Sequence, residues 1–339
     1  MEDDFSRFGF RGPAVSAGRR AWLLTLDFEA FTARTASLWH QAMRRWAAHC
    51  RAGGWKFSFF VSVEDVVRLR NESSGLYDEF LDACAELHGA GVEYCPHNHC
   101  LFDVSTGKRV TSTAEGERQV HGYPKRPSMY YDLAYRNGAT FREWLPKLMQ
   151  AYDQFLEDAH ISRPAALAFR AGGWDYGSTE ADVGDYLEGL VAGGFAYESG
   201  AVRGIRGTRS WRIGASFGSN TFRLVPPLIE VAPTDSLNCG AASGSIPYFG
   251  WISRILRQPR LWRPPFATGV LVTVLHFDHL FHAGHGISRR AFAIDDPKEV
   301  ARRIDGFFRR IHAARRLLML HSCGFSELPE ILRCGDSRG

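Results

Sequence analysis

The sequence lacks the features that define several common protein classes. Its seven cysteines are odd in number and include no Cys-x-x-Cys pair, which favours reduced thiols over a disulfide framework. No stretch approaches about 20 uninterrupted apolar residues, so no membrane span is expected. The first residues are acidic where a signal peptide would be basic, and no apolar run follows them. These absences together predict a cytoplasmic protein.

The sequence also lacks a dominant charge and the common nucleotide-binding motifs. Its 41 basic residues nearly balance 37 acidic ones, unlike the one-sided composition of a dedicated nucleic-acid binder. No GxGxxG, P-loop or GxSxG pattern follows a predicted strand. We find no internal repeat, low-complexity segment or linker, and we therefore expect a single domain over residues 1–339.

What the sequence does contain is a sustained alternation of apolar strands with amphipathic helices. Strands are predicted at 21–31, 55–63, 92–96, 165–170, 195–200, 222–232, 268–277 and 317–321. Helices are predicted at 36–51, 75–90, 139–159, 180–193 and 297–314, with a short one from about 326. This order predicts an α/β fold of parallel strands, either a barrel or a doubly wound sheet.

We favour a TIM-barrel-like (β/α) barrel of about seven to eight parallel strands, because polar residues fall at the ends of non-adjacent strands. In a barrel those carboxyl ends converge on one face, whereas an open sheet spreads them along a line. Two segments interrupt the rhythm. Residues 103–138 form a polar excursion without a period, and residues 251–266 form a basic aromatic segment.

His97 and His99 sit two positions apart at the end of a predicted strand. Alternate residues of an extended segment share a face, so both imidazoles can point at one ion. Two histidines and one carboxylate, with a position left open for water, make a catalytic zinc site. Asp27 or Glu29 can supply the carboxylate, and the other can then take a proton from the water. Alternatively, nearby Arg or backbone groups satisfy both acids.

Arg170 ends a predicted strand before a Gly-Gly turn that allows close backbone approach. It can pair with the carboxylate that acts as base, holding it ionised, or it can form a purely structural ion pair. Gly173 and Trp174 follow, and the side chain of Trp174 can either form an apolar wall against a sugar ring or belong to the core. His321, at the expected end of the last strand, suits a general acid that protonates a leaving amine.

A second group of polar residues, His276 and Asp278, alternates at the end of the predicted strand 268–277. The two can form a second metal pair or a His–Asp dyad, and we place them among the substrate-binding residues. Cys95 and Cys100 flank the histidine pair and are further candidate ligands, although cysteine is also a common small buried residue.

The segment Arg254–Arg263 combines four arginines with apolar residues. It suits a phosphate-bearing ligand or peripheral contact with an anionic membrane, while a solvated edge is the commoner explanation for such a segment.

Four short motifs, taken in order, resemble the NodB-homology polysaccharide deacetylases, carbohydrate esterase family four. Thr25-Leu-Asp-Phe-Glu29 is similar to the paired acids of the family, and His97-Asn-His99 to its metal histidines. Phe169-Arg-Ala-Gly-Gly-Trp174 is similar to its arginine motif, and Leu318-Met-Leu-His-Ser322 to its leucine–histidine motif. The two-residue histidine spacing resembles divergent members.

The resemblance implies a distorted (β/α) barrel, a divalent metal, most often zinc, and hydrolysis of an N-acetyl group from an amino sugar. It further implies Asp27 as base, Glu29, His97 and His99 as metal ligands, Arg170 as the partner of the base and His321 as acid.

We therefore expect a metal-dependent carbohydrate N-deacetylase. Its substrate would be a small-molecule or lipid-linked amino sugar, in keeping with a cytoplasmic location. Two alternatives stay open: hydrolysis of another non-peptide C–N bond, such as a cyclic imide, and a non-catalytic barrel that binds glycans.

Overall fold

The computed structural model describes most of the predicted core of the chain. The described residues are 11–13, 21–28, 36–98, 104–105, 141–171, 180–200, 221–223, 227–231, 235–236, 270–281, 296–318 and 320–331. The basic aromatic segment 251–266 and nearly all of the excursion 103–138 lie outside them.

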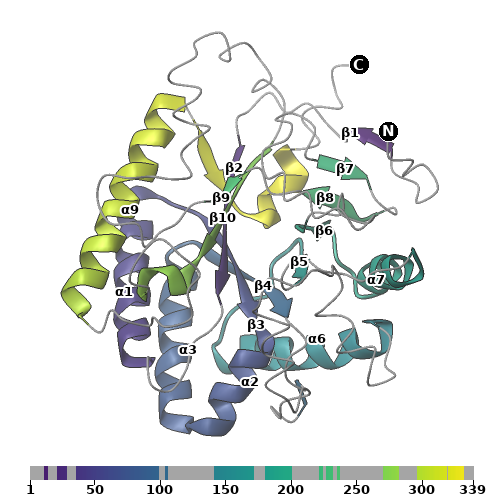
Figure 1. The fold of residues 1–339 in the computed structure, drawn as a ribbon, viewed down its shortest axis with the longest axis horizontal. Coiled ribbons are helices and arrows are strands. Elements are labelled where there is room, and N and C mark those ends of the chain that lie inside the picture. The colour runs from purple at the N-terminus through teal and green to yellow at the C-terminus, as the bar shows by residue number, and fades with distance from the viewer. Residues whose placement is uncertain are drawn as a thin grey trace, which may run out of the picture.

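The described strands form one 11-stranded sheet (Figure 1). They are β1 (Arg11–Pro13), β2 (Ala21–Phe28), β3 (Phe57–Ser62), β4 (Val92–Asn98), β5 (Ala168–Ala171), β6 (Tyr197–Glu198), β7 (Thr221–Arg223), β8 (Ile229–Val231), β9 (Asp235–Ser236), β10 (Val270–His276) and β11 (His321–Cys323). The helices are α1 (Ala36–Gly53), α2 (Val63–Glu72), α3 (Ser74–Gly89), α6 (Phe141–Asp158), α7 (Glu180–Ala192) and α9 (Pro297–Leu318), with 3-10 turns η6 (Phe277–Phe281) and η7 (Phe325–Glu327).

The order of the strands around the sheet is cyclic. Going outward from β2, the neighbours on one side are β3, β4, β5, β6 and β8, and on the other side β10 and then β9, all parallel. The last long strand therefore lies beside the first, as in a (β/α) barrel. A doubly wound sheet would instead count upward on both sides. Among the described residues no pairing joins β8 to β9, so the sheet is a curled half-barrel.

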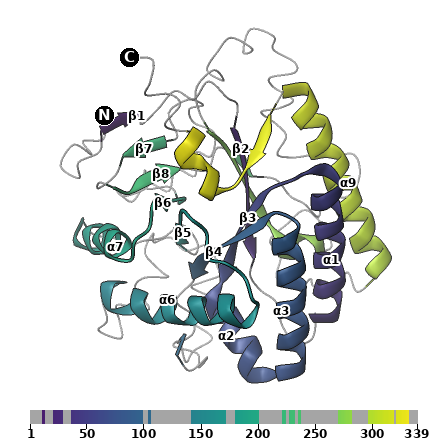
Figure 2. The ribbon, with the colours of Figure 1, turned by 180° about the vertical axis from the view of Figure 1, so that it is seen from behind.

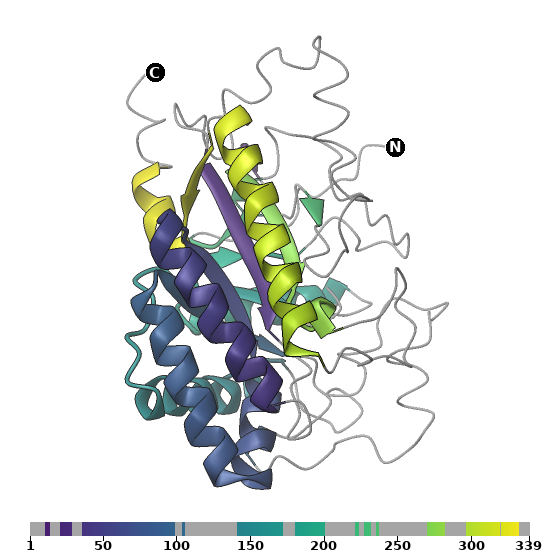
Figure 3. The same cartoon turned by 90° about the vertical axis from the view of Figure 1, so that its left-hand side faces the viewer.

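All described helices cover one face of this sheet. The larger apolar cluster joins the outward side chains of the strands, such as Trp22 and Phe59, to residues of every described helix except the short 3-10 turn η7. The smaller cluster, on the opposite face, contains strand residues such as Leu23, Phe60 and Cys95 together with the closing segment, and no residue of α1 to α9. Figures 2 and 3 show the helices as a single layer, with α1, α3 and α9 side by side. The inner face is thus left for polar groups.

Helix α9 is held to α1 through both aromatic rings and ion pairs. Phe307 stacks on Trp46 of α1 with ring centroids 5.1 Å apart. Asp305 accepts two hydrogen bonds from Arg45, and these lower the pKa of that carboxyl to about 2. The strand and helix registers behind the inner face are therefore fixed by dense packing.

Two of the predicted elements differ from the structure, and one described helix was missed. The predicted strand 222–232 is two antiparallel strands, β7 and β8, because the chain reverses between them. The predicted strand 317–321 is wrong, since α9 continues to Leu318 and β11 begins only at His321. Helix α2, between β3 and α3, was not predicted at all.

None of the described helices combines the length and apolar character needed to cross a membrane. The four described cysteines, Cys50, Cys84, Cys95 and Cys323, are buried free thiols. Burial raises the pKa of each of them, so each is held as the neutral thiol.

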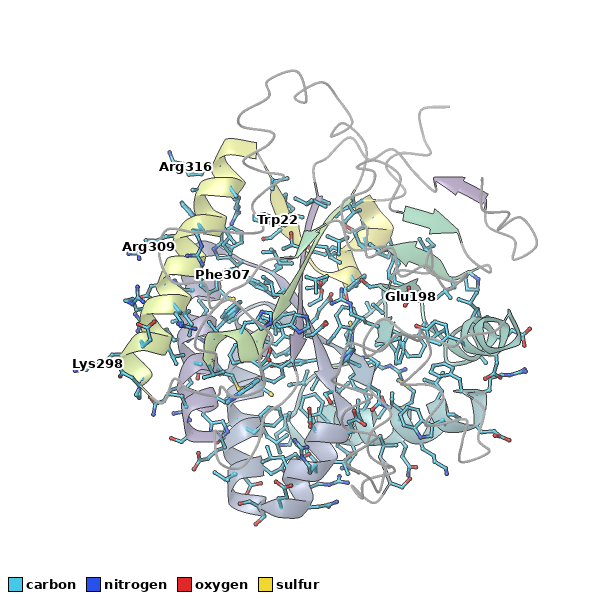
Figure 4. The ribbon with its side chains drawn as sticks, in the orientation of Figure 1. Trp22, Glu198, Lys298, Phe307, Arg309 and Arg316 are labelled. Carbon is cyan, nitrogen blue, oxygen red and sulfur yellow. The ribbon has the colours of Figure 1, made fainter. Side chains whose placement is uncertain are left out.

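We expect Phe307→Ala to lower the free energy of unfolding by about 3–5 kcal/mol, because it leaves a cavity beside Trp46. Figure 4 shows Phe307 directed toward the sheet, whereas Arg309 of the same helix points away from it. Arg309→Ala is the matched control and should stay within about 0.5 kcal/mol. Urea titration followed by circular dichroism measures both, and equal losses in the two variants would contradict the packing described for α9.

Candidate active site

The carboxyl ends of β2, β4, β5 and β10 bring four of the predicted residues to one edge of the inner face. His276 is in register with Asp27 across β10 and β2, and His97 is in register with Arg170 across β4 and β5. Alternation along each strand turns their side chains to the face that carries no helix. The sheet therefore places an acid, an arginine and two histidines at one end of the half-barrel.

Arg170 is the centre of this arrangement and is fully buried. Its Nη1 donates to Asp27 Oδ1 at 2.5 Å, and its Nη2 donates to Thr25 Oγ1 at 2.8 Å and Ser199 Oγ at 3.0 Å. Its Nε donates to the Ser199 carbonyl at 2.8 Å. The guanidinium carbon lies 4.2 Å from the centroid of the Phe60 ring. A charge taken this far from water requires such partners, and the structure supplies them from two other strands, β2 and β3, and from the residue after β6.

The two hydroxyls that accept hydrogen bonds from Arg170 also donate hydrogen bonds to the backbone of two further strands. Thr25 Oγ1 donates to the Thr273 carbonyl at 3.1 Å, and Ser199 Oγ donates to the Val231 carbonyl at 3.2 Å. Each hydroxyl thus accepts from the guanidinium and donates to a backbone carbonyl. The network crosses the interior from β10 to β8 and fixes the arginine in one position.

Asp27 is held by Arg170 on one oxygen and faces His276 with the other. Its side chain is 3% exposed, and the His276 Nε2 lies 3.9 Å from Asp27 Oδ2. The Arg170 contact on Oδ1 leaves Oδ2 directed toward the end of the strands. A carboxylate fixed on one side by a buried arginine is oriented for proton transfer on the other.

His97 is buried, and its Nδ1 donates to the backbone carbonyl of Arg170 at 2.9 Å. Because a carbonyl oxygen can only accept, Nδ1 carries a proton, and in the neutral ring Nε2 is then the lone-pair nitrogen. Histidines that bind metals are commonly fixed in this way by a backbone carbonyl. The tautomer of His97 therefore fits a metal ligand.

The turn η6 adds a second set of polar groups beside Asp27. One ligand atom from each of His276, Asp278 and His279 lies within 4.8 Å of those of the other two. All three residues are half-buried, and the rings of the two histidines are 4.9 Å apart. Asp278 and His276 thus lie together, as their spacing predicted.

His321 does not join this group. It is the first residue of β11 and pairs with Ala21, the first residue of β2, whereas Asp27 lies near the carboxyl end of β2. Six residues of strand separate the two levels, roughly 20 Å. His321 is also exposed. The prediction that it ends its strand beside the base is wrong, because α9 runs through the apolar residues that were taken for the strand.

Four predicted site residues lie outside the described residues: Glu29, His99, Gly173 and Trp174. In the sequence, Glu29 comes immediately after β2 and His99 immediately after β4. Their roles stay predictions.

Sequence reasoning missed the residues that hold Arg170, namely Thr25, Ser199 and Phe60. The signal for one of them was present. Thr25 is two residues before Asp27, so alternation along the strand places both side chains on the same face. Ser199 comes from another part of the sheet, and its contact with Arg170 depends on which strands become neighbours. Phe60 gives no such signal, since an aromatic residue in a buried strand is ordinary core.

No family model matches the chain, and a search of curated proteins finds no relative. Among solved structures, a crystal structure from Mycobacterium smegmatis described as a "putative polysaccharide deacetylase" is similar, with 15% sequence identity and a TM-score of 0.47. The match covers 96% of this chain and 95% of that one. A similarity this low carries no inference about function, which has to rest on the residues themselves.

We expect Arg170→Met to destabilise the protein by about 3–5 kcal/mol, because Asp27 would be left charged and buried without its partner. Arg163→Met is the control, since Arg163 forms an exposed pair with Asp153 at 3.4 Å that should contribute about 1 kcal/mol or less. Urea unfolding measures both variants. A similar, small loss in the two would mean that the buried pair does not constrain the site.

Proposed function

We propose that the chain is a metal-dependent hydrolase that removes an N-acetyl group from an amino sugar or a sugar-containing metabolite, built on a distorted, NodB-type (β/α) barrel. The observation that carries the proposal is the buried Asp27–Arg170 pair at the carboxyl edge of the strands, with His276 on β10 next to Asp27 and His97 on β4 next to Arg170. Three of the four motifs that resemble the NodB-homology deacetylases, those of Asp27, His97 and Arg170, support the same chemistry.

The proposed metal ligands are His97, His99 and Glu29, and the proposed ion is zinc. The tautomer of His97, fixed by the Arg170 carbonyl, supports this set. Two imidazoles and a carboxylate suit zinc and leave a coordination position open. When bound, a divalent ion would lower the pKa of a water molecule and polarise the acetamide carbonyl.

Asp27 acts as the general base in this proposal. Arg170 holds its Oδ1, so Oδ2 is the oxygen that takes a proton from the attacking water. The ion pair with the arginine holds the carboxylate in one orientation before and after the proton arrives. Asp27 is thereby the base and Glu29 the ligand.

His276 replaces His321 as the proposed proton donor to the departing amine. Its Nε2 lies 3.9 Å from Asp27 Oδ2, and its side chain is 29% exposed, so it can meet both the site and a substrate. The departing nitrogen must gain one proton as the C–N bond breaks, and an imidazolium can supply it near neutral pH. Asp278 and the residues Gly173 and Trp174 remain proposed substrate contacts.

The substrate class follows from the site only in part. A small-molecule or lipid-linked amino sugar fits the proposed reaction, and acetate release from a panel of N-acetylated monosaccharides, nucleotide sugars and lipid-linked sugars would test it. Release that is abolished by a chelator and restored by zinc is expected. A protein that binds zinc but releases no acetate, and instead opens cyclic imides, would favour the alternative C–N hydrolase.

We expect Asp27→Asn to lower the rate of acetate release by about a hundredfold or more while the bound zinc stays near the wild-type amount. The amide cannot take a proton from water, but it preserves the shape of the side chain. Metal content by mass spectrometry is measured on the same preparation. Loss of zinc together with activity would show that Asp27 is a ligand and that the roles of Asp27 and Glu29 are exchanged.

His276→Gln and His321→Gln form a matched pair for the proton donor. We expect His276→Gln to lower the rate about a hundredfold or more, because the leaving amine loses its proton source. His321→Gln should stay within about twofold, since that residue lies at the other end of β2. The reverse pattern would restore the role that the motif resemblance implied for His321.

A further inference from the structure

The turn η6 contains two metal-capable side chains for which the proposed reaction has no metal-binding use. Asp278 and His279 lie with His276 so that one ligand atom from each is within 4.8 Å of the others. The proposed hydrolase uses His276 as a proton donor and Asp278 as a substrate contact, and neither as a metal ligand. A carboxylate and two imidazoles so close together form a donor set of their own.

The backbone that carries these three residues is rigidly placed. Phe277 packs against Trp39, Trp46 and Phe28 with ring centroids 4.8, 5.6 and 5.1 Å apart, and Phe281 stacks on Trp39. Because Phe277, Leu280 and Phe281 are anchored in the core, the intervening polar residues are held at the surface of the site.

Arg303 of α9 fixes the same turn from behind. Its Nη1 donates to the carbonyls of His279 and Leu280 at 3.4 and 3.3 Å, and Glu299 accepts from its Nε at 3.0 Å. These hydrogen bonds hold the backbone of η6 against α9. Rotation of the side chains alone is then needed to bring the three donor atoms together.

The donor chemistry favours a divalent transition metal over calcium or magnesium. Two imidazole nitrogens and one carboxylate are the ligands of many catalytic zinc sites, whereas calcium and magnesium prefer oxygen. Zinc bonds of about 2.1 Å place neighbouring ligand atoms roughly 3.4 Å apart. The donors must close by little more than 1 Å, which half-buried side chains can do by rotation.

We propose that His276, Asp278 and His279 bind a second zinc ion, in addition to the one assigned to Glu29, His97 and His99, and that this ion inhibits the enzyme. A metal bound to His276 occupies the nitrogen lone pair that must carry the donated proton. The binding stands by itself, whereas the inhibition rests on the proposed function.

Zinc titration of the full chain, by equilibrium dialysis with metal quantification, tests the binding without any assay of activity. The wild type should bind two equivalents. Asp278→Asn and His279→Gln should each lose one, and His97→Gln should lose the other. His312→Gln, which removes an exposed histidine of α9, is the control and should keep two.

Loss of zinc through misfolding is distinguished from loss of a ligand in two ways. Asp278→Asn replaces only a carboxylate oxygen by an amide nitrogen, and the circular dichroism spectrum of each variant is compared with that of the wild type. Zinc binding that neither Asp278→Asn nor His279→Gln reduces would overturn the proposal, whether the wild type binds one equivalent or two. A single equivalent that both variants lose would keep the site at η6 and overturn the site assigned to Glu29, His97 and His99.

Acetate release tests the inhibition. For each protein, the rate of acetate release with excess zinc is divided by its own rate at one equivalent of zinc. In the wild type this ratio should be about one hundredth at saturation, matching the loss of a proton donor. In His279→Gln it should stay near one. Two bound ions without inhibition would overturn the inhibitory role. Absence of any acetate release would overturn the proposed function and leave the binding result intact.

Discussion

Burying one guanidinium group is the constraint on which the inner face of this protein depends. Arg170 has no contact with water, and a charge in that position is tolerated only if nearly every donor is satisfied. Asp27 neutralises it, Thr25 and Ser199 accept its hydrogen bonds, and Phe60 lies against its carbon. The strands on both sides must keep their registers for these contacts to exist. The orientation of Asp27 is thus a consequence of how the barrel interior is stabilised.

The cyclic order of the strands explains why the opposite ends of the chain contribute to one site. Because β10 lies beside β2, His276 meets Asp27 although they are far apart in the sequence. On the other side, β4 and β5 bring His97 to the backbone of Arg170. Asp27, the proposed base, therefore lies beside His276, the proposed proton donor, and on the same face of the sheet as His97, a proposed metal ligand.

Much of this arrangement could be predicted from the sequence, and the exceptions have physical reasons. Apolar strands ending in polar residues identified Asp27, His97 and Arg170, because alternation and a shared carboxyl edge follow from strand geometry alone. The residues Leu317 to Leu320 could not be assigned, since a short apolar run reads equally as strand or buried helix. That ambiguity moved His321 to the wrong end of the sheet. The partners Ser199 and Phe60 depend on which strands become neighbours, and local pattern does not contain that information.

The hydrogen-bond polarity around Arg170 has a consequence for how this sequence can vary. Thr25 and Ser199 each accept from the guanidinium and donate onward to a carbonyl, so neither can be replaced by a group that only donates. A lysine at position 170 would offer fewer donors and no planar face for Phe60. Positions 25, 27, 60, 170 and 199 should therefore change together in descendants of this chain, as one inherited unit spread over three strands and the residue that follows a fourth.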